Sequence, residues 1–167
     1  MNIELRARTE EHVRIYFERT RDPEIQSMLP QVAATMEAAL ESYRKTLLPD
    51  ARSYGRTIYA DGDYVGDIWC YGMDSNDEPN AMLSYCLFEK SLWGKGITTA
   101  ALQKFLEDAV GRFGLKTVGA FAYCSNQASG RVLEKNGFAM VERFAENGVE
   151  SAYYQKIIMR FPTHHNE

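Results

Sequence analysis

The sequence lacks any stretch that approaches the ~18 consecutive apolar residues of a membrane-spanning helix. It also lacks a cationic start leading into an apolar run, so no signal peptide is visible. Cysteine is scarce: Cys70, Cys86 and Cys124 are odd in number and lie in apolar, strand-like runs. They are expected to be buried thiols in a reducing compartment rather than a disulfide framework. The expected location is therefore the cytoplasm.

An excess of basic residues is missing as well. The 167 residues include 19 Lys and Arg against 23 Asp and Glu, a formal net charge of −4. Nucleic-acid-binding domains usually carry a basic stripe, so no nucleic-acid partner is expected. The mild acidity suits a cationic amine substrate, but only weakly. Histidine is rare, and the two adjacent tail residues His164 and His165 do not make a metal site without partners, so no metal site is predicted.

The length predicts one domain over residues 1–161, followed by a tail at 162–167. Alternating or continuous apolar patterns predict strands at 3–7, 54–60, 64–71, 81–88, 116–124, 138–144 and 151–161. Helical spacing and capping residues predict helices from Thr9 onward and over 35–48, 98–113 and 126–136. Early helices followed by a run of antiparallel strands favour an α+β fold over a strictly alternating βαβ plan.

Local turn chemistry adds further predictions. Asp61-Gly62-Asp63 and Asn147-Gly148 each separate two strand patterns and predict hairpins. Thr9 is predicted to cap the first helix. His12 stands where a capping box would have Glu or Gln, so no capping box is expected.

The stretch Ser84–Thr99 carries the strongest functional signal. A strand pattern feeds a basic turn, Trp93-Gly94-Lys95-Gly96, and a helix pattern follows. Two glycines at this spacing allow main-chain conformations that gather N–H groups at a helix start, where the helix dipole also favours an anion. The stretch is not a P-loop, because Gly96 follows Gly94-Lys95 where that motif needs Ser or Thr. Nor is it a dinucleotide fingerprint, because Thr99 replaces the third glycine.

Two segments together resemble the GNAT acyltransferase superfamily. The turn from Ser91 to Gly96 is similar to its Gln/Arg-x-x-Gly-x-Gly/Ala signature, with Ser91 in the first position. The segment from Asn126 to Phe138 resembles its Asn-x-x-Ser/Ala helix ending in Lys-x-Gly-Phe. The nearest likeness is to the branch of ribosomal-protein N-terminal acetyltransferases. The resemblance implies a mixed, mostly antiparallel sheet of six to seven strands flanked by about four helices.

The resemblance also implies acetyl-CoA as co-substrate. Main-chain amides of the turn would hold its pyrophosphate, namely those of Trp93, Gly94, Lys95, Gly96, Ile97 and Thr98. Leu87 would pair with the pantetheine arm, and the amide of Tyr85 or Cys86 would face the thioester carbonyl. Asn126 is either a helix cap or a hydrogen-bonding partner of the arm, with Ser129 on the same face.

The acid and base of the reaction are open at this stage. Many relatives have a Tyr that protonates the departing thiolate where this chain has Leu133. Candidate general bases are Asp67, Tyr123 and Glu89, each expected to be structural or solvated rather than catalytic, and a water chain could replace all of them. His12 is expected at the surface. Cys124 lies in apolar surroundings and is expected to be an inert thiol.

The resulting hypothesis is an N-acetyltransferase that transfers acetyl from acetyl-CoA to a primary amine by direct attack in a ternary complex. The acceptor, a protein N-terminus or a small-molecule amine, is left open. The alternatives are a non-catalytic CoA-binding or sensing module and a structural dimerisation domain. A homodimer could form under any of these through a final strand with Tyr153 and Tyr154 at the sheet edge.

Overall fold

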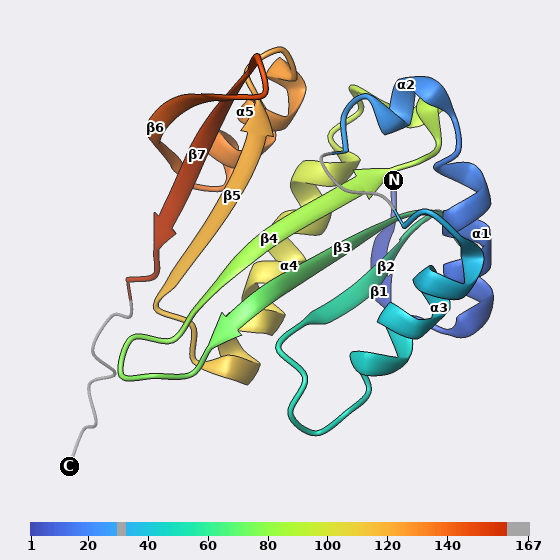
Figure 1. The fold of residues 1–167 in the computed structure, drawn as a ribbon, viewed down its shortest axis with the longest axis horizontal. Helices are drawn as coiled ribbons and strands as arrows, with labels where there is room; N and C mark the ends of the chain where they lie inside the picture. The colour runs from blue at the N-terminus through green and yellow to red at the C-terminus, as the bar shows by residue number, and fades with distance from the viewer. Residues whose placement is uncertain (30–32, 160–167) are drawn as a thin grey trace.

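The structure, a computed structural model, describes residues 1–29 and 33–159 and contains a seven-stranded mixed sheet in the order β1-β2-β3-β4-β5-β7-β6 (Figure 1). Its strands are β1 (Ile3–Arg6), β2 (Tyr54–Ala60), β3 (Asp63–Asp74), β4 (Asn80–Leu87), β5 (Thr117–Tyr123), β6 (Ala139–Glu146) and β7 (Val149–Ile157). The β4–β5 pair is parallel and the other neighbouring pairs are antiparallel. The predicted α+β fold is confirmed. The predicted tail lies outside the described residues.

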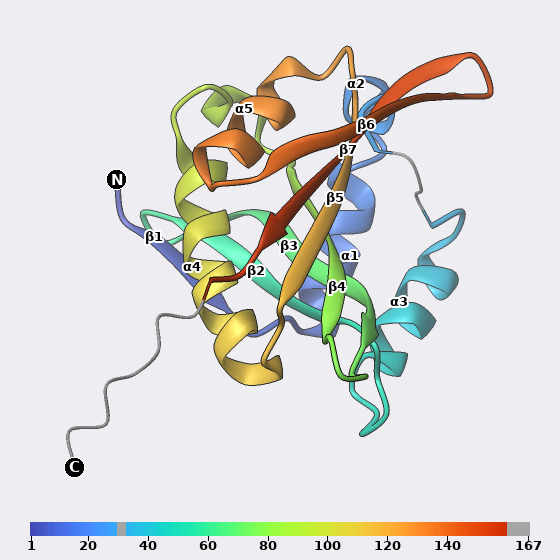
Figure 2. The same ribbon diagram turned by 90° about the vertical axis from the view of Figure 1, so that its left-hand side faces the viewer.

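The helices cover the two faces of the sheet unequally. They are α1 (Glu10–Arg19), α2 (Pro23–Gln26), α3 (Met36–Lys45), α4 (Ile97–Phe113) and α5 (Gln127–Lys135), with a 3-10 turn at Lys90–Leu92. Figures 1 and 2 show α4 against one face, and α1 and α3 beside the opposite face of β2 and β3. No described helix combines the length and the apolar character that crossing a membrane requires.

The main core lies between the sheet and α4. Ile68, Leu83 and Val118 point from neighbouring strands towards Leu102 and Phe105 of α4, and all five are at most 2% exposed. Burying a large apolar side chain contributes about 1.5–3 kcal/mol. This packing anchors α4 and thereby fixes the position of the glycine turn that precedes it.

Both predicted hairpins form as the sequence indicates. Asp61 and Gly62 have φ values of 49° and 87°, and Asn147 and Gly148 have values of 51° and 78°. Positive φ at both central residues is the requirement of a type I′ turn, which matches the twist of the flanking strands.

Two predictions are wrong. A capping box does form on α1: Thr9 accepts from the amide of His12, and the Nδ1 atom of His12 accepts from the amide of Thr9 at 3.1 Å. An imidazole nitrogen can thus do what the carboxylate of Glu usually does. The predicted edge position of Tyr153 and Tyr154 is also wrong, because β7 lies between β5 and β6, and β6 forms the edge.

Candidate active site

A gap opens between β4 and β5 because their pairing stops halfway. The parallel ladder joins Asn80–Leu83 to Thr117–Ala120, but β4 continues to Leu87 and β5 continues to Tyr123. The facing edges of the two strands beyond the ladder have no partner strand among the described residues. An unpaired strand edge presents main-chain donors and acceptors that an extended ligand can bind.

The direction of the main-chain groups on β4 can be read from its neighbours. The amide of Phe88 donates to the carbonyl of Val65 at 3.0 Å, so Phe88 points its main chain towards β3. Since successive residues of a strand point these groups to opposite sides, Leu87 and Tyr85 present theirs to the gap. The Trp93 indole nitrogen donates to the carbonyl of Leu87 at 2.7 Å, which agrees with this direction. The main chain of Cys86, by the same alternation, faces β3.

The turn after β4 forms a cradle of main-chain N–H groups at the start of α4. Gly94 and Gly96 have φ values of 77° and 80°, and a Cβ atom on either would project into open space. The first helical bond here is donated by Ala100 to Gly96 at 3.1 Å. Within the described residues, the amides of residues 94–99 have no hydrogen-bond acceptor. Such free donors beside the positive end of a helix dipole suit a phosphate or pyrophosphate.

The turn departs from the predicted donor set at both of its ends. The amide of Trp93 donates to Lys90 at 3.1 Å and is therefore engaged within the turn. The free donors begin at Gly94 and extend to Thr99, one residue further than predicted. Ser91, which replaces the usual Gln or Arg, donates through its hydroxyl to Glu89 at 3.0 Å.

The far side of the gap is formed by the start of α5. Asn126 caps this helix, with its side-chain oxygen accepting from the amide of Ser129 at 3.1 Å. Its side-chain nitrogen has no partner among the described residues and stays available to a ligand. Ser129 in turn meets the hydroxyl of Tyr85, with 2.8 Å between the two oxygens. Leu133, one turn further, is fully buried.

Two of the candidate bases are held by cationic partners. Asp67 is 1% exposed, accepts from the hydroxyl of Tyr64 at 2.6 Å and lies 3.0 Å from Arg8. Burial raises its pKa to about 6, although Arg8 and Tyr64 act in the opposite direction. Glu89 accepts from Arg19 at 2.8 Å, and that bond together with the one from Ser91 lowers its pKa. A deeply buried group and a paired one are both poorly placed to take a proton from a substrate.

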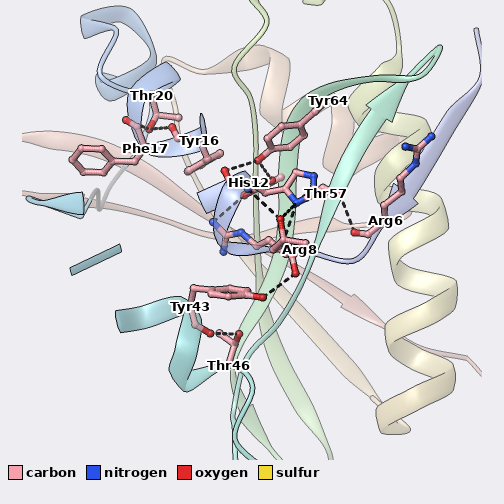
Figure 3. Close-up of polar contacts among 12 residues, drawn as sticks. Arg6, Arg8, His12, Tyr16, Phe17, Thr20, Tyr43, Thr46, Thr57 and Tyr64 are labelled. Carbon is pink, nitrogen blue, oxygen red and sulfur yellow. Dashed lines mark hydrogen bonds and ion pairs between the residues drawn. The ribbon is translucent and has the colours of Figure 1, made fainter. Parts of the chain in front are cut away.

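The side chain of His12 lies in a polar cluster beneath α1. Figure 3 shows Arg8, His12 and Tyr64 gathered beside β2 and β3. The Nε2 atom of His12 lies 2.7 Å from the hydroxyl of Tyr59, and its other ring nitrogen serves the cap. Burial and then Arg8 lower its pKa. His12 is therefore part of a half-buried structural cluster, not the surface residue that was expected.

The remaining candidates take up different positions. Tyr123 ends β5 opposite Ser151 and is half-buried at the edge of the gap. Cys86 is buried on the α1 side of β4, and burial raises its pKa to about 12. Cys124 is free and half-buried. A pocket of about 630 Å³ between β1 and α4, lined partly by Arg56 and Lys104, contains none of the predicted site residues.

Sequence reasoning missed two side chains at the gap. The Tyr85 residue was considered only for its amide, yet its hydroxyl reaches α5. The Trp93 residue was likewise considered only for its amide, yet its indole N–H donates a hydrogen bond to the carbonyl of Leu87. Strand alternation could have placed Tyr85 on the α5 side, but nothing in the sequence indicates the Trp93 bond.

The arrangement of gap, glycine turn and capped helix agrees with comparisons to known proteins. Residues 2–139 match the profile of the Acetyltransferase (GNAT) domain. The chain therefore belongs to the GNAT acetyltransferases, a family of acetyl-CoA-dependent N-acetyltransferases. No curated protein sequence matches it.

Several solved structures share the fold. One is the RimL ribosomal L7/L12 alpha-N-protein acetyltransferase in complex with coenzyme A, with 23% identity, 95% of each chain covered and a TM-score of 0.80. Another is the aminoglycoside acetyltransferase AAC(6′)-Ib with paromomycin and acetyl-CoA, with 17% identity, 94% of each chain covered and a TM-score of 0.79. A third is the spermidine N-acetyltransferase from Vibrio cholerae with CoA and spermine, with 15% identity, 93% of this chain and 95% of that chain covered, and a TM-score of 0.81. At these identities the likeness shows the fold.

Proposed function

We propose that this protein transfers an acetyl group from acetyl-CoA to a primary amine, which attacks the thioester directly in a ternary complex. The observation that carries the proposal is the row of free amides at residues 94–99, placed next to the unpaired edge of β4. A pyrophosphate needs the free amides, and a pantetheine arm needs the unpaired strand edge. The CoA complexes of structures with this fold support the same assignment.

The residues of this chain would share the work as follows. The turn amides would bind the pyrophosphate, and the free N–H of Leu87 would donate to a carbonyl of the arm. The carbonyl of Leu87 already accepts from the Trp93 indole and leaves the N–H as the available group. Of the two candidate amides for the thioester oxygen, that of Tyr85 faces the gap. A donor aimed at this oxygen stabilises the negative charge that develops during attack. The side-chain nitrogen of Asn126 would hold the arm from the α5 side.

The acceptor that this site favours is an α-amine, as at a protein N-terminus. Asp67 and Glu89 are both held by cations, so neither carboxylate is free to take the proton of the amine. Without a strong base, the neutral fraction of the acceptor limits the rate. An α-amine has a pKa of about 7.7–8.0 and an alkylamine about 10.4, so at pH 7 the neutral fraction of the α-amine is roughly 300-fold larger.

Binding is tested by calorimetry with acetyl-CoA and CoA on the wild type and on Gly94→Val/Gly96→Val. Branched side chains at positive φ strain the turn by about 1–2 kcal/mol each and displace its amides, so binding is expected to vanish. Gly72→Val is the matched control, because Gly72 has a φ of 58°, open space around it and a position towards the opposite end of the β3–β4 pair. It should lose stability but keep binding. A wild type that binds neither ligand would refute the proposal.

The acceptor class is tested with a free-thiol assay on a panel of amines. The panel pairs peptides that have a free N-terminus and no lysine with N-blocked lysine peptides, spermidine and an aminoglycoside. The free α-amines are expected to react fastest at pH 7, with the alkylamines gaining on them as the pH rises. Faster turnover of spermidine or the aminoglycoside at pH 7 would remove the α-amine assignment. Cofactor binding without turnover of any acceptor would favour a non-catalytic CoA-binding module.

A further inference from the structure

The outer edge of β1 is a second unpaired strand edge, separated from the gap by β2 and β3. β1 ends the sheet and lies beside α4 (Figure 2). The amide of Asp61 donates to the carbonyl of Asn2 at 2.8 Å, so Asn2 directs its main chain towards β2. Because successive residues of a strand alternate, Ile3 and Leu5 direct theirs outwards. No partner strand lies there among the described residues, so these main-chain groups are available to a ligand.

The pocket of about 630 Å³ between β1 and α4 runs along this edge. Ile3 and Leu5 line it from β1, and Lys104 and Arg112 line it from α4. The step of eight residues from Lys104 to Arg112 corresponds to about 12 Å of helix. The four residues of β1 extend over about 13 Å. The two walls therefore match the length of an extended segment of about four residues.

The pocket carries a surplus of positive charge. Its two carboxylates, Glu4 and Asp108, are each paired with an arginine of their own element, at 3.0 and 2.8 Å respectively. Arg56 and Lys104 line the same pocket and make no ion pair in the part of the chain that the structure describes. The whole chain has a formal net charge of −4, so this local excess is not a general property of its surface.

Arg56 is held in position without a ligand. It pairs with Ile68, whose side chain lies in the core beneath α4, so the side chain of Arg56 is on the same face of the sheet. Its guanidinium carbon lies 4.5 Å from the centroid of the Tyr54 ring, and the hydroxyl of Tyr54 donates to Asp108. A guanidinium that is already stacked loses less conformational freedom when it binds a carboxylate.

We propose that this pocket binds an extended acidic peptide segment of a partner protein, which adds to the sheet as an antiparallel strand beside β1. Its main chain pairs with Ile3 and Leu5, and its carboxylates meet Arg56 and Lys104. Antiparallel pairing is the more stable kind per residue. The two cations exclude basic strands from this edge and select acidic ones. The site is separate from the gap, so the proposal stands independently of acetyl transfer.

The geometry also decides which residues of the peptide do both tasks. The side chains of Ile3 and Leu5 pack on the α4 face of the sheet, where Arg56 and Lys104 lie. In an antiparallel pair, directly opposite residues have their side chains on the same face. The acidic residues that meet the cations are therefore those whose own N–H and C=O groups pair with β1.

The first test measures the fluorescence anisotropy of a dye-labelled hexapeptide of alternating Glu and Thr. Its acetylated N-terminus and lack of lysine prevent it from serving as an amine acceptor. The wild type should bind it at least about 10-fold more tightly than the matching Gln-Thr peptide, and Arg56→Gln/Lys104→Gln should weaken the Glu-Thr peptide by about 10-fold. The control is Arg52→Gln/Lys135→Gln, which removes the same charge from two exposed residues outside the pocket and should keep full binding.

The second test distinguishes strand pairing from a general attraction between charges. N-methylation of the Glu residues of the peptide removes the N–H groups that pair with β1 and should abolish binding. N-methylation of the Thr residues alters amides that point away from β1 and should leave binding within about 3-fold of the unmodified peptide. Equal binding of the two methylated peptides, or the reverse order, overturns the proposal.

Three other outcomes would also overturn the proposal. The first is a wild type that does not bind the Glu-Thr peptide at about 1 mM. The second is an equal loss of binding in the pocket variant and in the control variant, which would reflect net charge alone. The third is binding of inorganic pyrophosphate, lost in the pocket variant, without binding of the peptide, which would define a small-anion site. Each outcome is independent of whether the protein binds acetyl-CoA.

Discussion

Removing the charge of Arg8 should reveal how Asp67 is tolerated in the interior. Asp67 is buried 3.0 Å from Arg8, and burial raises its pKa to about 6 from an ordinary value of 3.8. The folded state therefore binds this proton more tightly than the unfolded state. The contribution of Asp67 to stability is present below pH 4 and is lost as the pH rises to about 6, above which it is constant.

In Arg8→Met the same loss should continue to higher pH. Without the guanidinium the pKa of Asp67 rises further, so the carboxyl stays protonated at neutral pH. Each unit of pH beyond 6 then costs about 1 kcal/mol that the wild type does not lose. At pH 5 the titration of Asp67 should contribute equally to the free energy of unfolding of the variant and the wild type. At pH 7 it should make the variant less stable by about 1–2 kcal/mol. A pH-independent loss of packing near Tyr16 comes in addition.

Urea denaturation at pH 5, 6, 7 and 8 measures the difference between the two proteins. Arg14→Met is the control, because Arg14 is exposed and its contact with Glu10 is 3.8 Å long. Exposed pairs contribute about 0–1 kcal/mol, so this variant should show a small difference that does not grow between pH 5 and 8. A penalty for Arg8→Met that is constant over this range, or that shrinks as the pH rises, would show that Asp67 does not titrate as reasoned.

Two further predictions concern the walls of the site. Gly66→Ala should destabilise the protein by more than about 2 kcal/mol in urea denaturation, because its Cβ would overlap the carbonyl oxygen of Cys86, and the backbone of β4 cannot easily move aside. A loss below about 0.5 kcal/mol would contradict this. Asn126→Asp should keep the helix cap and hence stability, whereas Asn126→Ala should lose about 1 kcal/mol. If Asn126 also holds the pantetheine arm, both should weaken CoA binding in calorimetry; unchanged binding in Asn126→Asp would leave it a cap alone.

Local chemistry accounts for what the sequence predicted well. The Asn147-Gly148 hairpin follows from residues that tolerate positive φ, and the cap at Asn126 follows from a side chain that reaches its own helix. The glycine turn was located because its two glycines also tolerate positive φ. Each of these features is decided within a few residues, so a single sequence contains the information.

Features that depend on the packing of distant segments were not predictable in the same way. The position of β7 inside the sheet depends on β5 and β6 pairing with it from either side, which no local pattern encodes. The role of His12 depends on Tyr59, 47 residues away, and that of Asp67 on Arg8. These partners decide whether a titratable side chain is a base or a structural group. Spacing along the chain therefore could not choose among the candidates.

The site depends on the two-residue period of β4. Side chains at Tyr85 and Leu87 lie on the α4 face of the sheet, where Tyr85 reaches α5, and the side chain of Cys86 faces α1. The main-chain groups of Tyr85 and Leu87 face the gap. One strand edge can therefore present a phenol and a row of amides to the same space. A shift of one residue in register would turn the Tyr85 phenol towards α1 and the amides of Cys86 into the gap. Gly66 lies so close to the main chain of Cys86 that only a residue without a Cβ fits there. This contact therefore opposes a register shift and keeps Tyr85 in the position where it meets Ser129.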